Sequence, residues 1–380
     1  MAWSGVRLTV LAGPTIPTPL PPNYTHRLIS VDVTESDQQP SVFTLTFDAG
    51  RSRTEGLLDA PGVRDAPFGP SARVVVLVIL GASASVLLDG IVTDVRLTPG
   101  ASPGAATLAV TGEDVSYLID RVEHTDQHPA LDDATQVRKV LMPYLSYGIK
   151  PLVLPAPTMD TPLPADRIPS QQQSDLAYIE ELASRHGYAA YMVPGPVPGI
   201  STFYWGPPIR VGTPQPALSV NLGVETNISG LTFGSVASLP IDVIGEVLDR
   251  RTGEPGRVDV RAGTRPPLAV RPVRATGRRQ RLVSDPTSDL IAAWARAQAQ
   301  LDRNEDAVTA TGTIDGARYQ HVLRPRGLVG VRGAGWTYDG LWYVQEVAHH
   351  LTRGSYQQDV TLRREGHGST VPLVPVSGAG

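Results

Sequence analysis

Two adjacent histidines, His349 and His350, are the residues of this sequence whose types and spacing first suggest chemistry. Imidazole side chains are common metal ligands, so such a pair could mark a metal site. The surrounding stretch WYVQEVAHHLTRGSYQQDVTLRR alternates apolar and polar residues, which predicts two strands joined by a short connection at Gly354. Successive side chains of a strand point to opposite faces, so both rings could reach one metal only at a bulge. We therefore expect no metal here and a structural role for each histidine.

The same alternation assigns the hairpin side chains to two faces of its first strand. One face is expected to carry Tyr343, Val347, His349 and Leu351, and the other Trp342, Val344, Ala348 and His350. On the returning strand the inward side chains are expected to be Tyr356, Val360 and Leu362. At least one face of the hairpin should therefore be buried.

Other signatures of catalysis are absent from the sequence. It contains no GxxxxGK[ST] phosphate loop, no GxSxG nucleophile elbow and no HExxH motif. The remaining histidines are isolated along the chain: His26, His124, His128, His186, His321 and His367. Glu180 and Glu181 are expected on a solvated helix face, and Asp132 and Asp133 as helix caps. We predict no catalytic, cofactor-binding or metal-ligating residues, although paired carboxylates from distant loops would leave no sequence signal.

Composition and charge narrow the classes of partner. The 380 residues suffice for two or three domains, and a formal net charge of -4 is close to neutral. The absence of cysteine excludes disulfides, thiolate metal sites and cysteine nucleophiles. The arginine-rich residues 271–281 lack interleaved aromatic residues and lysines, which favours a solvated loop or protein interface over nucleic-acid binding. We expect no cofactor and no specific nucleic-acid partner.

No segment of the sequence has the character of a membrane span. The apolar stretch VVVLVILGASASVLL, which begins at Val74, is broken by Gly81 and serines and predicts two buried strands. The N-terminal run MAWSGVRLTVLAGPTIPTP carries Arg7 against its apolar residues and prolines close behind, which makes it a poor secretory signal. We therefore expect no membrane partner.

Residues 1–125 are expected to form a first β-barrel domain. The alternating apolar residues of RLISVDVTES and VFTLTF predict two half-buried strands. The later stretch LLDGIVTDVRLTPGASPGAATLAVTGEDVSYLIDRV predicts a strand, a turn, a strand over residues 107–111 and a short helix from about Asp114.

Residues 126–212 change to helical periodicity and are expected to form an inserted α/β domain. In DDATQVRKVLMPYL, Asp132 or Asp133 can cap a helix that Pro143 should kink or end. The stretches YAAYMV and ISTFYW predict two strands that close this domain.

The segment SDLAYIEELASRHG predicts a second helix in this domain. Ser174 can cap its start and Gly187 can end it, while His186 stands at the negative end of the helix dipole and is assigned a structural role. Its buried stripe is expected to consist of Leu176, Ile179 and Leu182.

Residues 213–365 return to strand patterns and are expected to form a second β-barrel domain. The stretch VIGEVLDRRTGEPGRVDVRAG predicts two strands around a turn at residues 253–256. Residues 366–380 are rich in Gly, Ser and Pro and are expected to form a flexible tail.

A helix is predicted within this last domain, near residues 286–303. Asp285 can cap it and Pro286 can occupy its first turn. The expected buried face consists of Leu290, Trp294, Ala297 and Leu301. This helix should pack on a sheet through Trp294.

Three blocks of the sequence resemble motifs of the phage late control D family, the baseplate hubs of contractile tails and related injection systems. The blocks are LLDGIVTDVRL with ATLAVTGEDVSYLIDR, then SDLAYIEELASRHGYAAYM, then GLVGVRGAGWTYDGLWYVQEVAHHLTRGSYQQDVTLRR. In the last block the motif positions are occupied by Gly340, Trp342, Val344, Val347, His350, Gly354, Tyr356, Leu362 and Arg363. Gln358 stands where threonine is usual. The blocks follow the family's order and span nearly the whole chain.

The resemblance implies a mainly β fold with an α+β insertion: two tube-protein-like β-barrel domains plus the small α/β domain, similar to the hub part of VgrG. Residues near 24–125 and 216–365 should then share one topology. Three chains would form a homotrimer, a tube–spike adaptor that joins the sixfold inner tube to a threefold spike. Its implied partners are a separate spike protein, the inner tube or a tube-initiator protein, and baseplate wedge proteins. It would assemble in the bacterial cytoplasm and then become part of the particle.

The implied role is that of a structural protein without enzymatic activity. Two other functions remain open from the sequence. One is a tail-associated cell-wall hydrolase or peptidase on the same scaffold. The other is a carbohydrate-binding protein with an exposed aromatic platform, for which Trp205, Trp336 and Tyr338 are candidates.

Overall fold

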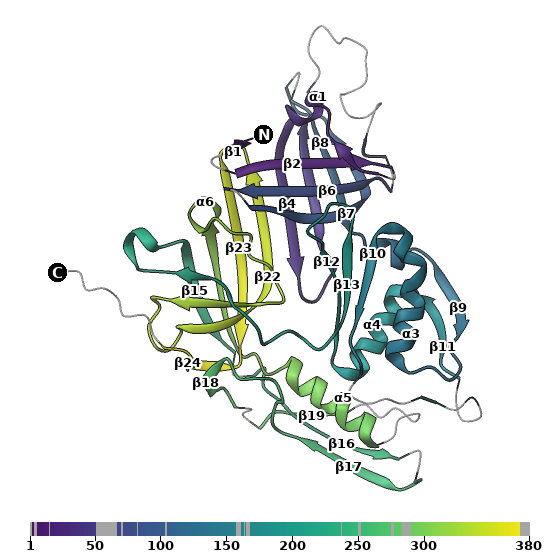
Figure 1. Ribbon diagram of the computed structural model, residues 1–380. Coiled ribbons are helices and arrows are strands. Elements are labelled where there is room, and N and C mark those ends of the chain that lie inside the picture. The colour runs from purple at the N-terminus through teal and green to yellow at the C-terminus, as the bar shows by residue number, and fades with distance from the viewer. Residues whose placement is uncertain are drawn as a thin grey trace, which may run out of the picture.

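A computed structural model gives the structure of the protein (Figure 1). It describes all residues except 1, 4–5, 15, 51–66, 70, 82, 103–104, 157–160, 163, 165–167, 237, 250–251, 275–276, 283–289 and 373–380. The described chain is mainly β and contains several sheets, which agrees with the expected fold class. None of its described helices is long and apolar enough to cross a membrane.

The N-terminal part is built from strands and two short helices. Its elements are β1 (Ala2–Trp3), β2 (Val6–Gly13), β3 (Thr18–Pro19), α1 (Pro22–Thr25), β4 (Leu28–Ser36), β5 (Val42–Asp48), β6 (Arg73–Leu80), β7 (Ser83–Thr98), β8 (Thr107–Asp114) and α2 (Tyr117–Asp120). The predicted strands are confirmed, including the buried pair β6 and β7. Gly81 has φ of 58°, a conformation that glycine adopts without strain, and it turns the chain between them.

The middle of the chain forms a three-stranded sheet covered by helices and a further two-stranded sheet, which together we name the α/β segment. Its elements are β9 (Glu123–Gln127), α3 (Asp133–Leu141), the 3₁₀ helix η1 (Met142–Tyr147), β10 (Ile149–Val153), β11 (Ser170–Ser174), α4 (Asp175–His186), β12 (Ala189–Pro194) and β13 (Ser201–Gly206). Asp132 caps α3 through the backbone N–H of Thr135. Ser174 caps α4, and Gly187 ends it with φ of 65°. The sequence-based predictions for both helices are confirmed, because caps are local interactions.

The C-terminal part returns to strands. Its elements are β14 (Gln215–Ser219), η2 (Gly223–Glu225), β15 (Ile228–Ser235), β16 (Asp242–Leu248), β17 (Pro255–Val260), β18 (Ala269–Pro272), β19 (Arg279–Arg281), α5 (Leu290–Arg303), β20 (Val308–Asp315), α6 (Gly316–Tyr319), β21 (Leu328–Arg332), β22 (Gly340–Thr352), β23 (Ser355–Arg364) and β24 (Gly366–Ser369). Residues 366–369 were expected in a flexible tail, but β24 pairs with β18. Gly366 permits this pairing, because a Cβ there would lie 2.1 Å from the carbonyl oxygen of Arg271.

Helix α5 packs on the small sheet of β16, β17 and β19 (Figure 1), but not through Trp294. The Trp294 side chain is 41% exposed, whereas Ala293 is buried against the sheet. The apolar stripe of α5 consists of Leu290, Ala293, Ala297 and Leu301. The assignment of Trp294 to the buried face was therefore wrong, because small alanines let the helix approach the sheet closely. The predicted caps Asp285 and Pro286 lie outside the described residues.

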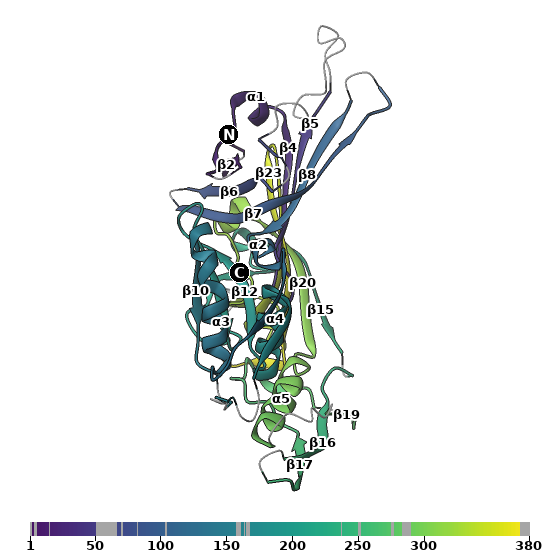
Figure 2. The same cartoon turned by 90° about the vertical axis from the view of Figure 1, so that its right-hand side faces the viewer.

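One connected sheet runs through both ends of the chain. Its strand order is β1-β2-β6-β7-β8-β5-β4-β22-β23-β20-β15, with β21 on β22 and β14 on β21. Strand β4 and the C-terminal strand β22 lie side by side as antiparallel neighbours (Figures 1 and 2). The N-terminal and C-terminal strands therefore belong to a single structure, not to two separate sheets.

The two halves of this sheet repeat one strand order. We name β2, β4, β5, β6, β7 and β8 the first β unit, and β14, β15, β20, β21, β22 and β23 the second β unit. In the sheet the first unit runs β2-β6-β7-β8-β5-β4 and the second β14-β21-β22-β23-β20-β15, so each strand has a counterpart at the same chain rank. One difference is that β14 runs parallel to β21, whereas β2 runs antiparallel to β6.

One register irregularity lies at the same place in both units. The ladder of β7 and β8 shifts between Val92 and Asp94, and that of β22 and β23 shifts between Val344 and Glu346. The ladder of β4 and β5 shifts between Leu28 and Ser30, whereas that of β15 and β20 shifts slightly further along, between Ser229 and Thr232. The shifts between β6 and β7 and between β14 and β21 have no counterpart in the other unit. Bulges bend strands locally, so the shared bulge bends β7 and β22 at equivalent positions.

The bulge at Gln345 changes the expected faces of the hairpin. Trp342, Val344 and Val347 pack in one apolar cluster, whereas Tyr343 packs in another. The prediction that Tyr343 shares a face with Val347 was wrong, because the extra residue reverses the alternation between them. The inward prediction for Tyr356 on β23 is confirmed, since its side chain is 3% exposed.

Candidate assembly interface

The most extensive contact between the two β units is the ladder of β4 with β22. Seven residue pairs form it, from Ser36 opposite Glu346 to Ser30 opposite Thr352. The connection is apolar near one end, where Leu351 of the second unit lies opposite Val31 and packs in the core of the first unit. We name this contact the internal joint.

A buried polar cluster crosses the internal joint. Arg324, from the loop before β21, donates from Nη1 to Glu35 Oε1 at 2.7 Å and to the carbonyl oxygen of Leu87 at 3.0 Å. The ring of His349 contacts Tyr356 Oη through Nδ1 at 3.0 Å and Glu35 through Nε2 at 3.3 Å. The second contact is electrostatic rather than a well-aligned hydrogen bond. The second unit thus places an arginine and a histidine around one carboxylate of the first.

Burial and neighbours fix the protonation of this cluster. Burial alone would raise the pKa of Glu35, but Arg324 and His349 outweigh it and hold that pKa below its ordinary value. Burial lowers the pKa of His349 against the opposing effect of Glu35. At neutral pH the cluster therefore contains a neutral imidazole and an ionised carboxylate paired with a guanidinium.

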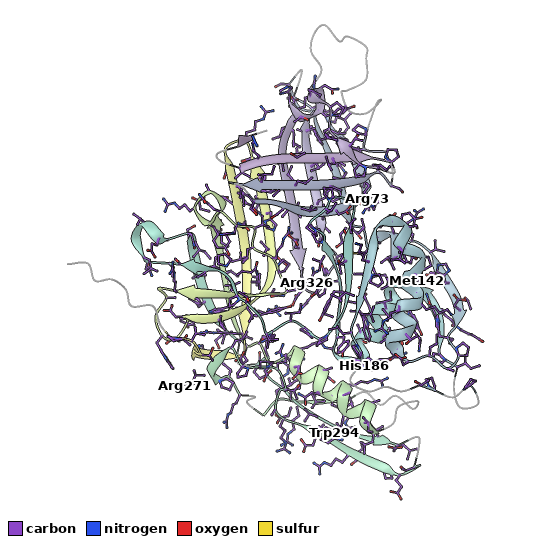
Figure 3. All side chains as sticks on the ribbon, in the orientation of Figure 1. Arg73, Met142, His186, Arg271, Trp294 and Arg326 are labelled. Carbon is purple, nitrogen blue, oxygen red and sulfur yellow. The ribbon has the colours of Figure 1, made fainter. Side chains whose placement is uncertain are left out.

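Arg326 lies where the two β units meet the α/β segment (Figure 3). Its guanidinium donates to the carbonyl oxygen of Ser36 in the first unit and to that of Met192 in the α/β segment. It also lies over the ring of Tyr191, 4.1 Å from the centroid. Arg326 is 7% exposed, so it holds three parts of the chain together from within.

Arg73 attaches the first β unit to the α/β segment in the same way. Its guanidinium forms two 2.7 Å hydrogen bonds with Asp89 and further bonds to the carbonyl oxygens of Tyr147 and Gly199. Asp89 also accepts from Ser201. Strand β7 supplies Asp89, the helix η1 supplies Tyr147 and a loop supplies Gly199, which restricts relative movement of the parts.

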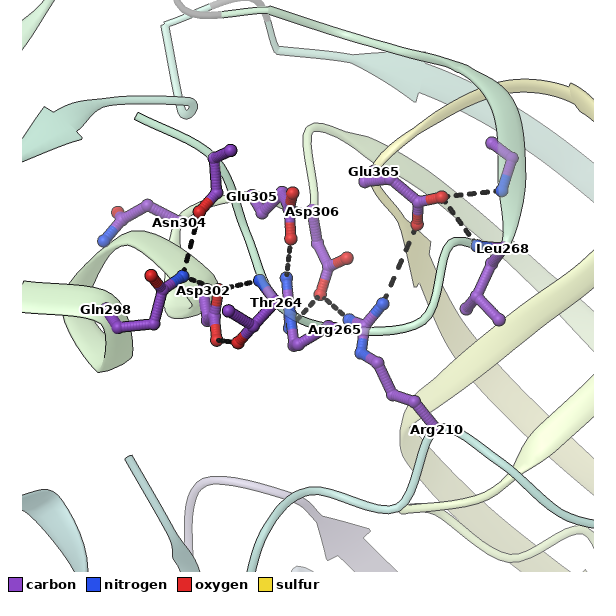
Figure 4. Close-up of polar contacts among 12 residues, drawn as sticks. Arg210, Thr264, Arg265, Leu268, Gln298, Asp302, Asn304, Glu305, Asp306 and Glu365 are labelled. Carbon is purple, nitrogen blue, oxygen red and sulfur yellow. Dashed lines mark hydrogen bonds and ion pairs between the residues drawn. The ribbon is translucent and has the colours of Figure 1, made fainter. Parts of the chain in front are cut away.

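A second network ties the region around α5 to the second β unit (Figure 4). Arg210 pairs with Asp306 and lies 3.8 Å from Glu365, and Arg265 donates to Asp306 at 3.2 Å. Glu365 in turn accepts from two backbone N–H groups, both at 2.6 Å. These four charged side chains pair with one another, and three of them, Arg210, Arg265 and Asp306, also line the cavity beside α4 and α5.

The adjacent histidines occupy opposite faces of β22, as the strand geometry predicted. His349 is fully buried in the internal joint, whereas His350 is 43% exposed and contacts Asp32 and Asp359. Among the residues that the structure describes, no three His, Asp or Glu side chains gather as a metal site would require. His350 occupies the motif position, but His349 makes the buried contacts.

The other sequence candidates have the local partners expected of structural residues. His186 contacts Asp133 Oδ2 at 2.9 Å and lies near the ring of Trp205. Glu181 is exposed and accepts from Arg185, as a solvated helix face requires. Glu180 is exposed too, on the same helix.

The aromatic residues considered as a carbohydrate platform do not gather on one surface. Trp205 is fully buried in the core of the α/β segment. Trp336 is 42% exposed, and Arg271 of the arginine-rich stretch lies over its ring at 5.0 Å. Tyr338 stacks on Phe233 with centroids 4.2 Å apart. This arrangement does not favour a carbohydrate-binding function.

A cavity of about 370 Å³ lies between α4, α5 and the second β unit. Its walls include Asp37, Tyr343, Arg303 and Arg363. Burial raises the pKa of Asp37 to about 6, although Arg363 opposes the shift. Three carboxylates line this cavity, those of Asp37, Glu180 and Asp306, and that of Asp306 is paired with Arg210 and Arg265.

The residues that organise the internal joint escaped the sequence analysis. Arg324, Arg326 and Glu35 are single charged residues in a loop or strand, and their spacing matches no motif. Their burial depends on partners hundreds of positions away in the chain. Glu35 is a charged residue in a strand that otherwise alternates apolar and polar residues. That position was the available sequence signal of a buried ion pair.

No family model matches the chain, and no curated protein matches its sequence. Solved structures do match its fold. A tail protein from Neisseria meningitidis has a TM-score of 0.65 at 14% identity, over 95% of this chain and 97% of that one. A type VI secretion component from E. coli, described as structurally similar to bacteriophage T4 tail proteins, has a TM-score of 0.52 at 14% identity, over 92% and 77%.

A chain of the Francisella PdpA–VgrG complex is also similar, with a TM-score of 0.58 at 9% identity, over 97% of this chain and 54% of that one. The similarity extends over both β units and the α/β segment, because each comparison covers more than nine-tenths of this chain. The chain therefore has the fold of phage tail proteins, which these secretion-system structures share.

Proposed function

We propose that this protein is the baseplate hub of a contractile phage tail or contractile injection system. It acts as a non-enzymatic adaptor that joins a sixfold inner tube to a threefold spike. The observation that carries the proposal is the repeat of one strand order, with one coincident bulge, in two units joined edge to edge. A chain that presents two similar units supplies six positions from three copies.

The proposed assembly is a closed homotrimer. Residues 1–125 and 213–365 contribute the two tube-like barrels, and residues 126–212 form the inserted α/β domain. Within the described part of the chain, the α/β segment and the group of β16, β17, β19 and α5 are each present once, without a counterpart in the other unit. They would occur three times around the ring, so they suit a threefold partner, whereas the repeated units suit a sixfold one.

The partners follow from this geometry. The sixfold side would receive the inner tube or a tube-initiator protein, and the threefold side a separate spike protein. Baseplate wedge proteins would surround the ring. Assembly would take place in the bacterial cytoplasm before the hub becomes part of the tail or injection particle.

The direct test is the mass of the full-length protein in solution. Light scattering after size-exclusion chromatography should give three times the chain mass of 40.5 kDa, alone or after addition of the spike protein. Electron microscopy of the same fraction should show a ring with six similar lobes on one side. A monomer or an even-numbered ring under both conditions would contradict the proposal.

A further inference from the structure

Each β unit has a strand edge that remains unpaired among the described residues. Gly90 and Ile91 of β7 pair with β6 on one edge and β8 on the other, but residues 94–98 pair with β8 alone. Strand β15 pairs with β20 and with no other described strand. Unpaired edges expose backbone N–H and C=O groups that can pair with another chain.

These two edges are the counterparts of the internal joint. Because the bulges coincide, Asp94 of β7 corresponds to Glu346 of β22, and the β7 residues that follow it correspond to the β22 residues that pair with β4. Counting through the ladders, Val33 of β4 corresponds to Phe233 of β15. Each unit thus has two edges of different kind, which we name the A edge and the B edge. The A edge is β4 in the first unit and β15 in the second, and the B edge is β7 in the first unit and β22 in the second. The internal joint uses one of each and leaves one of each free.

Side chains that are buried in the internal joint have counterparts on the unpaired edges that are exposed. Val347 and His349 are fully buried in the internal joint. Their counterparts Val95 and Leu97 are 38% and 39% exposed. On the opposite edge Val236, which directly follows β15, is 42% exposed. Exposed apolar side chains therefore line both free edges, at positions whose counterparts in the internal joint are buried.

We propose that β15 of one copy pairs antiparallel with residues 94–98 of β7 in the next copy, in the register of the internal joint. By the same correspondence the expected pairs are Asp94 with Val236, Val95 with Ser235, Arg96 with Gly234, Leu97 with Phe233 and Thr98 with Thr232. This inference rests on the proposed function, since a ring of copies requires such a contact. The contact is head to tail: each copy contributes β15 to one neighbour and β7 to the other. When the ring closes, every β15 and every β7 is therefore paired.

The exposed pair Thr98 and Thr232 permits a direct test, because the chain contains no cysteine. The full-length variant Thr98→Cys/Thr232→Cys should form interchain crosslinks on oxidation or with a short thiol-reactive crosslinker. Paired residues of adjacent strands have Cβ atoms about 5 Å apart, within reach of both chemistries. The crosslinked species should end at a closed trimer, with about tenfold more product than either single variant gives.

The internal joint supplies a matched control. Asp32 and His350 are the counterparts of Thr232 and Thr98, and they face each other within one chain. The variant Asp32→Cys/His350→Cys should crosslink within the chain and leave its mass unchanged. An equal mixture of Thr98→Cys and Thr232→Cys single variants should give crosslinked dimers, since each copy then carries one reactive edge.

The outcomes separate this inference from the proposed function. A preparation that light scattering shows to be trimeric, but in which the double variant does not crosslink, would overturn the strand pairing and leave the hub proposal intact. Crosslinking by either single variant alone would indicate a symmetric contact and would also overturn it. A protein that stays monomeric with and without the spike would overturn both.

Discussion

Glu35 of β4 and His349 of β22 face each other across the internal joint, with a carboxylate oxygen 3.3 Å from Nε2 of the imidazole. Both side chains are buried, at 3% and 0% exposure, and they are 314 positions apart in the chain. Neither residue lines the described cavity. The pair therefore has the position of a structural contact between the two β units.

Replacement of Arg324 by methionine should destabilise the protein by about 3 kcal/mol, because it leaves the buried carboxylate of Glu35 without its principal partner. Chemical denaturation at pH 7.5 measures the change. The double variant Glu35→Gln/Arg324→Met should recover part of the loss, since no uncompensated charge remains. Equal losses in the single and double variants would show that the pair has no such coupling.

Trp342→Ala should cost about 3 to 5 kcal/mol of stability. The indole is fully buried, donates from Nε1 to the carbonyl oxygen of Tyr338 at 2.9 Å, and lies under the guanidinium of Arg364. His350→Gln should cost less than about 1 kcal/mol, because His350 is half exposed. Comparable losses for the two variants, measured by denaturation, would contradict the assignment of His350 to the surface.

Asp37→Asn should stabilise the protein at pH 7.5, by up to about 3 kcal/mol. The pKa of Asp37 is about 6 in the folded protein, against 3.8 for an aspartate that is exposed to water, so folding disfavours its ionised form. Above pH 6 the wild type carries this penalty, and below about pH 4 the carboxyl is protonated in both states. The difference between the two proteins should therefore shrink from pH 6 to pH 4, which thermal unfolding at several pH values can follow.

The same Asp37→Asn variant tests the alternative of a cell-wall hydrolase. Under the hub proposal neither the wild type nor the variant clears a peptidoglycan suspension. Clearing by the wild type that Asp37→Asn abolishes without loss of folding would place catalysis in the 370 Å³ cavity and contradict a non-enzymatic role.

Leu97→Lys should weaken self-association at least about tenfold without loss of folding, because Leu97 is exposed in the single chain and enclosed in the proposed joint. Val224→Lys is the matched control, since Val224 is 98% exposed and lies on neither free edge. Sedimentation at several protein concentrations compares them. Equal weakening by both substitutions would point to a general charge effect.

Local features of this protein followed from its sequence. Helix α4 begins at Ser174 and ends at Gly187 as predicted, because a side-chain cap and a left-handed glycine act within a few residues. The separation of His349 from His350 followed too, since alternation is a property of every strand. The three motif blocks carried a family resemblance that fold similarity to phage tail proteins supports.

Features that depend on distant contacts did not follow from the sequence. Trp294 is exposed on α5, because alanines set the distance of that helix from its sheet. The residues around Gln345 give no sequence signal of a bulge, yet the bulge places Tyr343 on the face opposite to the one expected.

The internal joint shows the physical reason most clearly. Pairing of β4 with β22 is carried by backbone hydrogen bonds that any strand can form, so alternation predicts the strands but not which edges meet. Arg324 selects Glu35 only once folding has buried both in one place. Residue patterns therefore specify the helices, the strands and most of their faces, whereas long-range packing selects which strand edges are sealed and which are left for another chain.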